Sequence, residues 1–128
     1  MNKTENKEQA GNIETEKASS HFIKGIIQYM TNSVVIRTIL EKPTVNISLL
    51  AFDSGEGLTE KTSPFETFSH IIEGKAEIII DHVSHFLESG EGIVTPAHST
   101  NLTRANGRFK MILTSIKNTA EQFPLPLK

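Results

Sequence analysis

The chain has 128 residues, with 13 basic and 15 acidic side chains, a formal net charge of −2 and no cysteine. This length suits one domain and is too short for two independent cores. The absence of cysteine excludes disulfides, zinc–thiolate sites and thiol nucleophiles. The basic residues are scattered and form no stripe, which argues against nucleic acid as a partner. No apolar run approaches the ~20 residues that cross a bilayer, so no membrane partner is expected either.

The first 20 residues are rich in Lys, Glu, Asn, Gln and Thr, and Ile13 is their only β-branched aliphatic residue. Such a segment buries too little apolar surface to offset its ordering entropy, so a mobile arm is expected there. A secretory signal requires an apolar stretch after its positive charges, and this segment has none. Cytoplasmic location is therefore the expectation.

From His21 onward, short apolar or alternating runs recur at intervals of roughly ten residues, bounded by Gly, Pro, Asn or Asp. This is the pattern of an all-β sandwich or barrel. β-Branched residues dominate Val34–Leu40 and Glu77–Asp81, which favours strands over helices. The predicted strands are Phe22–Met30, Ser33–Leu40, Val45–Phe52, Phe68–Glu73, Ala76–Asp81, Val83–Leu87, Gly92–Thr95, Thr100–Ala105 and Phe109–Lys117.

Turn residues punctuate these runs. Asp53–Gly57 is expected to open a longer loop, Asp81–His82 to separate two strands, and Asn106–Gly107 to form a hairpin turn. Two prolines after Lys117 rule out a central strand there, so Phe123 and Leu125 are expected to pack onto the barrel from a surface tail. The predicted organisation is an arm at 1–20, one β-barrel domain at 21–117 and a tail at 118–128.

Two blocks resemble the paired motifs of the cupin superfamily. The first is DSGEGLTEKTSPFETFSHIIEGKAEIIID, Asp53–Asp81, whose second half resembles the family's apolar strand ending in Glu-Gly. The second is GEGIVTPAHSTNLTRA, Gly90–Ala105, in which Gly90 and Pro96 have the family's separation. The resemblance implies an all-β, single-domain double-stranded β-helix, or jelly roll, and a homodimer. A dimer would also protect the edge that a long apolar strand such as Val45–Phe52 would leave exposed.

The sequence departs from the family at its metal ligands. The resemblance places the family's three histidines and one acid on Lys61, Ser63, Asn101 and Thr67, and a longer spacing moves the first pair to Glu60 and Thr62. First-row transition metals bind through imidazole, thiolate or carboxylate groups, and a protonated lysine repels a cation. The resemblance therefore implies a cupin pocket without the usual metal, and no cofactor is expected.

Three functions fit this pocket. In the first, Lys61, Ser63, Thr67 and Asn101 bind a small polar or anionic metabolite, because one positive charge beside neutral donors suits a carboxylate or enol oxygen. The alternative is a water-filled pocket that no longer binds a ligand and in which Lys61 turns to solvent.

The second function is a metal-free isomerase or cyclase, with His98 or Glu66 as proton carrier. His98 follows a proline near the expected mouth of the barrel, and histidine exchanges protons readily near neutral pH. Glu66 lies beside the family's acid position and needs a bulge to turn inward. The third function is an atypical, dioxygenase-like metal site that combines His98 with a displaced Glu60 or Glu66. The sequence has no Gly-x-Ser-x-Gly elbow and no phosphate-binding glycine loop.

The other histidines are expected on the surface. His70 lies at an odd separation from Thr67 on one predicted strand, so the two face opposite sides, and His70 is assigned to the surface or a subunit interface. His82 and His85 flank a predicted hairpin. His21 borders the arm.

Overall fold

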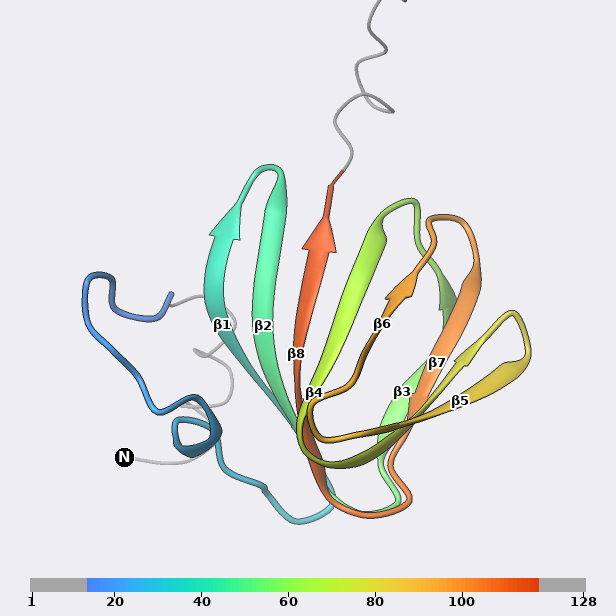
Figure 1. Ribbon diagram of the computed structural model, residues 1–128, viewed down its shortest axis with the longest axis horizontal. Coiled ribbons are helices and arrows are strands. Elements are labelled where there is room, and N and C mark those ends of the chain that lie inside the picture. Colours follow the sequence, from blue (N-terminus) through green and yellow to red (C-terminus); the bar gives the residue numbers. More distant parts are fainter. Residues whose placement is uncertain (1–13, 118–128) are drawn as a thin grey trace, which may run out of the picture.

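The structure, a computed structural model, describes residues 14–117. This part of the chain contains a short 3-10 helix and eight strands (Figure 1). The elements are η1 Ile23–Gly25, β1 Val34–Lys42, β2 Val45–Phe52, β3 Gly57–Thr62, β4 Glu66–Ile80, β5 Val83–Glu88, β6 Gly92–Thr95, β7 Thr100–Arg104 and β8 Phe109–Ile116. The all-β prediction is confirmed. The predicted tail at 118–128 lies outside the described residues.

The long strand β4 joins the two halves of the barrel, and every strand pair is antiparallel. Its first half pairs with β6 on one side and with β8 on the other. β8 pairs in turn with β2, and β2 with β1, which completes the first sheet. The second half of β4 pairs with β5 and with β7, which pairs in turn with β3 as the second sheet. The two sheets curl around a common interior and open at the end where β8 finishes and β4 begins (Figure 1). This is a jelly-roll barrel.

The bend in β4 lies at Gly74. Its φ is +80°, and a β-carbon there would lie 2.3 Å from the carbonyl oxygen of Arg108. The register with β8 shifts between Ile71 and Glu73, which marks a bulge. The sequence predicted two strands around this glycine, whereas the structure has one bent strand, because the bulge turns the chain without ending its pairing.

Two predicted turns have different outcomes. Asp81 and His82 have φ values of 49° and 70° and form the two-residue hairpin between β4 and β5, so that turn is confirmed. The hairpin predicted at Asn106–Gly107 is wrong, because β7 pairs with β3 and β4, whereas β8 pairs with β2 and β4. That segment crosses from one sheet to the other.

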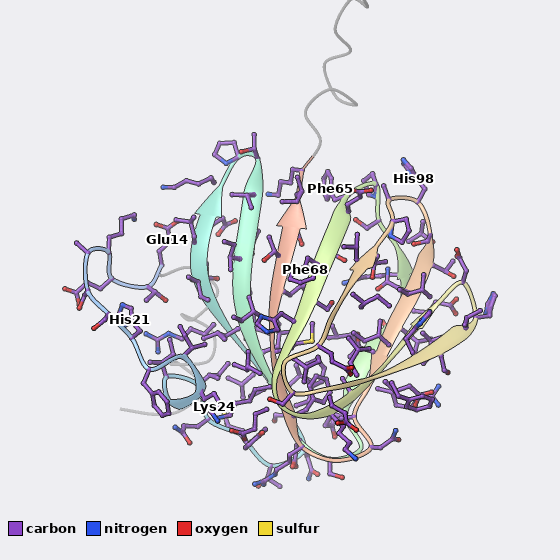
Figure 2. The ribbon with its side chains drawn as sticks, viewed as in Figure 1. Glu14, His21, Lys24, Phe65, Phe68 and His98 are labelled. Carbon is purple, nitrogen blue, oxygen red and sulfur yellow. The ribbon has the colours of Figure 1, made fainter. Side chains whose placement is uncertain are left out.

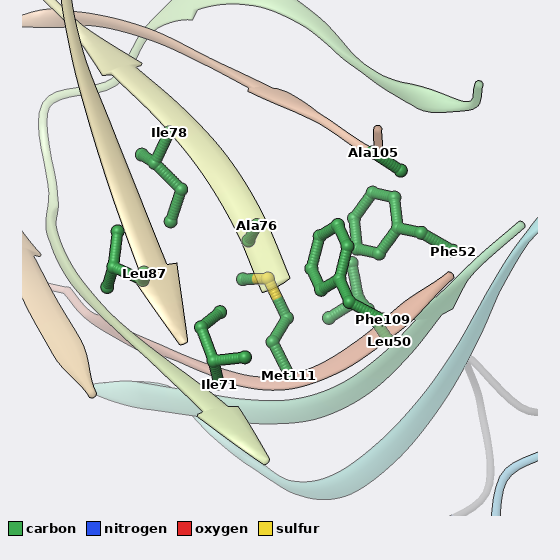
Figure 3. Packing of buried hydrophobic residues seen from close by; sticks show 9 residues of the cluster. All are labelled: Leu50, Phe52, Ile71, Ala76, Ile78, Leu87, Ala105, Phe109 and Met111. Atoms are coloured by element: carbon green, nitrogen blue, oxygen red, sulfur yellow. The ribbon is translucent and has the colours of Figure 1, made fainter. Parts of the chain in front are cut away.

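The closed end of the barrel is apolar. Phe52 and Phe109 stack there with ring centroids 4.3 Å apart, and neither is exposed. Ile71, Met111 and Leu87 pack in the same cluster (Figure 3). This cluster forms a solid floor beneath the open end.

The segment before β1 differs most from its prediction. Phe22–Met30 was predicted as a strand, but it contains η1 and covers the outer face of the first sheet, where Ile27 packs on Leu49 and Ala51. Part of the predicted arm is also ordered. Thr15 is buried, and its N–H donates to the carbonyl oxygen of Ile39 at 3.1 Å. Residues 1–13 of that predicted arm lie outside the described residues.

Two further predictions about strands are corrected. Gly57–Thr62 was predicted as loop and forms β3, whose side chains are mostly exposed. The expectation that Val45–Phe52 leaves an open edge is wrong, because β2 lies between β1 and β8. The strands with an unpaired edge in the described part of the chain are β1, β3, β5 and β6.

Candidate functional site

A band of hydroxyl groups lies above the apolar floor on the inner face of the first sheet. Leu113 packs against the core cluster, and its register partners Ser69 and Ser48 therefore share the inner face. Two residues further along the strands, Thr67 and Ser115 are partners on the same face. The band continues through Asn46 and Thr95.

The second sheet extends this band. Ile78 and Ile80 pack in or against the core cluster, and their partners on β7 are Thr103 and Asn101. Asn101 is in turn the partner of Lys61 on β3. The inner face thus changes from apolar at the floor to hydroxyl and carboxamide groups toward the mouth.

Several of these hydroxyls border space that water can reach. Ser69 and Thr95 are each 4% exposed and Thr103 is 7% exposed. Within residues 14–117 their hydroxyls have no hydrogen-bond partner, yet this part of the chain contains no fully buried side-chain oxygen without one. Their oxygens are therefore accessible in the interior and available to a ligand.

The structure brings together three of the four predicted binding residues. Lys61, Thr67 and Asn101 lie on the inner face by register, with Lys61 exposed at the mouth. Ser63 lies in the loop between β3 and β4, where its hydroxyl accepts from the Phe65 N–H at 3.0 Å. The Ser63 hydroxyl therefore stabilises the rim, whereas the other three side chains face the chamber or its opening.

The two predicted acid–base residues have different positions. His98, at φ 70°, is exposed in the turn between β6 and β7, and its N–H donates to the Ser63 carbonyl oxygen at 2.7 Å (Figure 2). Glu66 pairs with Ile116 on the outer face, and the register continues without a bulge as far as Ile71. The idea that a bulge turns Glu66 inward is therefore wrong.

The donor set does not suit a first-row transition metal. The inward positions hold a hydroxyl, a carboxamide and a lysine ammonium, and Glu60 is exposed on β3. Among residues 14–117 there is no group of three or more His, Cys, Asp or Glu side chains placed to hold one ion. The residues present fit a hydrogen-bonding ligand better than a metal.

Sequence reasoning missed His85. It was predicted on the surface, but it is half-buried and its register partner is the core residue Ile78, so it belongs to the inner face of the second sheet. The signal was present in the strand alternation, since His85 shares its side of Val83–Glu88 with the buried Leu87. Among the described residues, Lys61 and His85 are the ionisable side chains on the inner face of this sheet.

The groups with shifted pKa values lie elsewhere. Burial, and then the hydrogen bond to Glu73, raises the pKa of Tyr29 above its usual value. Hydrogen bonds from Arg108 and the Asn32 N–H lower the pKa of Asp53. Both groups hold the segment before β1 against the barrel and belong to its stability.

Solved structures identify the fold. No protein-family model matches the chain, and no curated protein matches its sequence significantly. A cupin superfamily protein from Desulfitobacterium hafniense is similar in structure, with a TM-score of 0.76, 25% identity, and coverage of 80% of this chain and 94% of that one. The chain has the cupin fold. The resemblance predicted from the two sequence blocks is confirmed.

Two other solved cupin-fold structures show how little the fold decides about activity. A conserved protein of unknown function from Streptococcus pyogenes has a TM-score of 0.78 and 24% identity, with coverage of 83% of this chain and 93% of that chain. Salicylate 1,2-dioxygenase from Pseudoaminobacter salicylatoxidans has a TM-score of 0.63 and 15% identity, and the match covers 70% of this chain but 27% of the enzyme. One fold serves many functions, so function is argued from the site. No helix in residues 14–117 has the length and apolar character needed to cross a membrane.

Proposed function

We propose that this cupin-fold protein is a metal-independent binding module for a small polar or anionic metabolite. The observation that carries the proposal is the hydroxyl and carboxamide band, which includes Ser69, Thr67 and Asn101, above a solid apolar floor. Several neutral hydrogen-bond groups that converge in a concave site fix the orientation of a polar ligand. Lys61 at the mouth supplies the positive charge that an anionic group of the ligand requires.

A thermal-shift screen in the presence of EDTA tests the proposal. The probes are D-gluconate, L-lactate and citrate as acids and sorbitol as a neutral polyol, each at millimolar concentration. A ligand that binds only the folded state raises the apparent stability, by about 2.7 kcal/mol when its concentration is 100 times Kd. We expect at least one acid to raise Tm. A screen in which none of these probes changes Tm would contradict the proposal.

A matched pair of variants locates the binding site. Thr67→Val removes an inner hydroxyl while it keeps the branched shape, and Thr114→Val makes the same change on the outer face of the same sheet, where Thr114 pairs with Phe68. Thr67→Val is expected to weaken binding, because its hydroxyl contacts the ligand, whereas Thr114→Val is expected to bind normally. Equal affinities for the two variants would place the ligand outside the barrel.

A metal-free isomerase or cyclase is the second candidate. It is favoured by the position of His98, whose turn is bonded to the Ser63 loop at the rim of the chamber. The test follows each acid that binds by proton NMR for conversion, with wild-type protein, His98→Ala and Glu66→Gln. Glu66→Gln, on the outer face, serves as the control and should leave conversion unchanged. Conversion that survives in His98→Ala rules out His98 as the proton carrier, and the absence of conversion in the wild type leaves only the binding module.

A further inference from the structure

A depression in the surface lies at the side of the barrel, where β5 and β6 diverge. The depression has a volume of about 560 Å³, is wide open to solvent, and is lined by His85, Ile93 and Glu91, among others. Each of these two strands pairs with β4 alone among the described residues, so their facing edges are unpaired. The depression is therefore a slot between the edges of the two sheets.

The residues that line the slot are neighbours of the hydroxyl band in the strand register. Ile93, on one wall, is the register partner of Ser69 and packs against the core cluster. On the other wall, His85 is the partner of Ile78, which itself pairs with Thr103. The residues that line the slot are thus direct neighbours of the band on both sheets.

We infer that the slot is a second arm of the ligand site, and that the His85 imidazole makes a hydrogen bond to the ligand there. This inference rests on the proposed binding function, which it deepens. An imidazole nitrogen donates to or accepts from a hydroxyl or carbonyl group. His85 is half-buried at the inner wall, so a bond to it is shielded from solvent more than one at the mouth.

The two arms differ in charge, which defines the ligand class. Lys61 lies on β3 and His85 on β5, at opposite edges of the second sheet and on the same concave face. Three strand spacings separate them, about 14 Å along the sheet, and their side chains converge toward the interior. A carboxylate of the ligand would face Lys61, its hydroxyls the band, and its far oxygen His85.

Glu91 decides against a second acidic group in the slot. Its carboxylate lines the slot and accepts from the Glu88 N–H at 2.8 Å, which holds the negative charge beside the opening. Glu91 is exposed, and its negative charge at the opening repels a second carboxylate of the ligand. The ligand class is therefore an elongated hydroxylated monocarboxylic acid, and the corresponding diacid is disfavoured.

Calorimetric titration with D-gluconate and with the diacid D-glucarate tests this assignment, with EDTA present. The variants are His85→Gln and the matched control His82→Gln, which changes the exposed turn residue of the same hairpin. His85→Gln is expected to raise the Kd for gluconate about tenfold, since it removes a shielded hydrogen bond. His82→Gln is expected to bind as the wild type does, and glucarate to bind more weakly than gluconate.

Chemical modification of the wild-type protein provides a measurement that needs no variant. Diethyl pyrocarbonate modifies accessible imidazoles, and peptide mapping separates the sites. Gluconate is expected to slow the modification of His85 and to leave the rate at His82 unchanged. Equal rates at His85 with and without bound gluconate overturn the inference.

The outcomes separate this inference from the proposed function. If neither acid binds the wild type but another probe of the thermal-shift screen does, the slot assignment fails and the binding function stands; if no probe binds, both fail. If gluconate binds and Thr67→Val weakens it, but His85→Gln does not, the binding function stands and the slot assignment is wrong. If glucarate binds as tightly as gluconate, the restriction to monocarboxylic acids is wrong.

Discussion

The hydroxyl of Tyr29 holds the segment before β1 against the barrel, and its removal by Tyr29→Phe should lower the free energy of unfolding. The hydroxyl donates to the Glu73 carboxylate at 2.6 Å. Arg108 and Lys110 lie over the ring, with their charged groups 5.0 and 4.9 Å from its centroid. Tyr29→Phe keeps the ring and both cation contacts and removes only the hydrogen bond.

The expected loss is about 1.5 kcal/mol. A hydrogen bond to a charged group contributes about 1.5–3 kcal/mol, and the lower end applies because Tyr29 is only half-buried. For a domain of this size, a loss of this magnitude lowers Tm by about 5–10 °C. Tyr29→Leu should lose about 1 kcal/mol more, because the cation contacts disappear with the ring.

Urea unfolding of the wild type, Tyr29→Phe, Glu73→Ala and the double variant measures the coupling directly. The double-mutant cycle should give an interaction energy of about 1 kcal/mol between the two side chains. If Tyr29→Phe changes the free energy of unfolding by less than about 0.3 kcal/mol, the hydrogen bond does not hold the segment in place. If the losses of the two single variants simply add in the double variant, the hydrogen bond between Tyr29 and Glu73 does not stabilise the fold.

Asp53 should stabilise the fold above its usual pKa near 4, because Arg108 holds its folded-state pKa lower. In urea unfolding at pH 7, the free energy of unfolding of the wild type should therefore exceed that of Asp53→Asn. The difference should shrink as the pH falls below about 4, and a difference that does not change with pH would refute the linkage. Gly74→Ala should cost more stability than Gly55→Ala, by ~2 kcal/mol or more, because both have positive φ but only at Gly74 does a β-carbon meet backbone. Equal decreases in Tm for the two variants would show that a β-carbon at residue 74 does not clash with the backbone. Phe109→Ala should lower the free energy of unfolding by about 3–5 kcal/mol, since the ring is unexposed and stacked; a loss below about 1 kcal/mol would show that the floor is not packed as described.

Strands with strong local signals were predicted closely. Val45–Phe52 and Gly92–Thr95 have the bounds predicted from their apolar runs and flanking turn residues. β3 was missed because Gly57–Thr62 is almost entirely polar and exposed, so it carries no apolar alternation. Its strand geometry comes from pairing with β7, whose register partners lie 38 to 47 residues further along the chain.

The segment Phe22–Met30 shows the opposite error. Its apolar residues suggested a strand, but Ile27 and its neighbours are buried by packing onto Leu49 and Ala51 on the outer face of the first sheet. An apolar run states that a segment is buried and leaves open whether its backbone pairs with another strand. Which of the two occurs depends on whether a sheet edge or a sheet face is available.

By itself the sequence determined the all-β class, and the resemblance carried by its two motif blocks predicted the cupin fold. The all-β class follows from local composition and the spacing of apolar runs, whereas the fold follows from the resemblance. The tertiary structure alone decided that no bulge turns Glu66 inward, and that β5 and β6 lie at sheet edges with His85 lining the slot between them. A bulge placement and the pairing of distant strands set which side of a strand faces the interior, and local sequence does not contain that register.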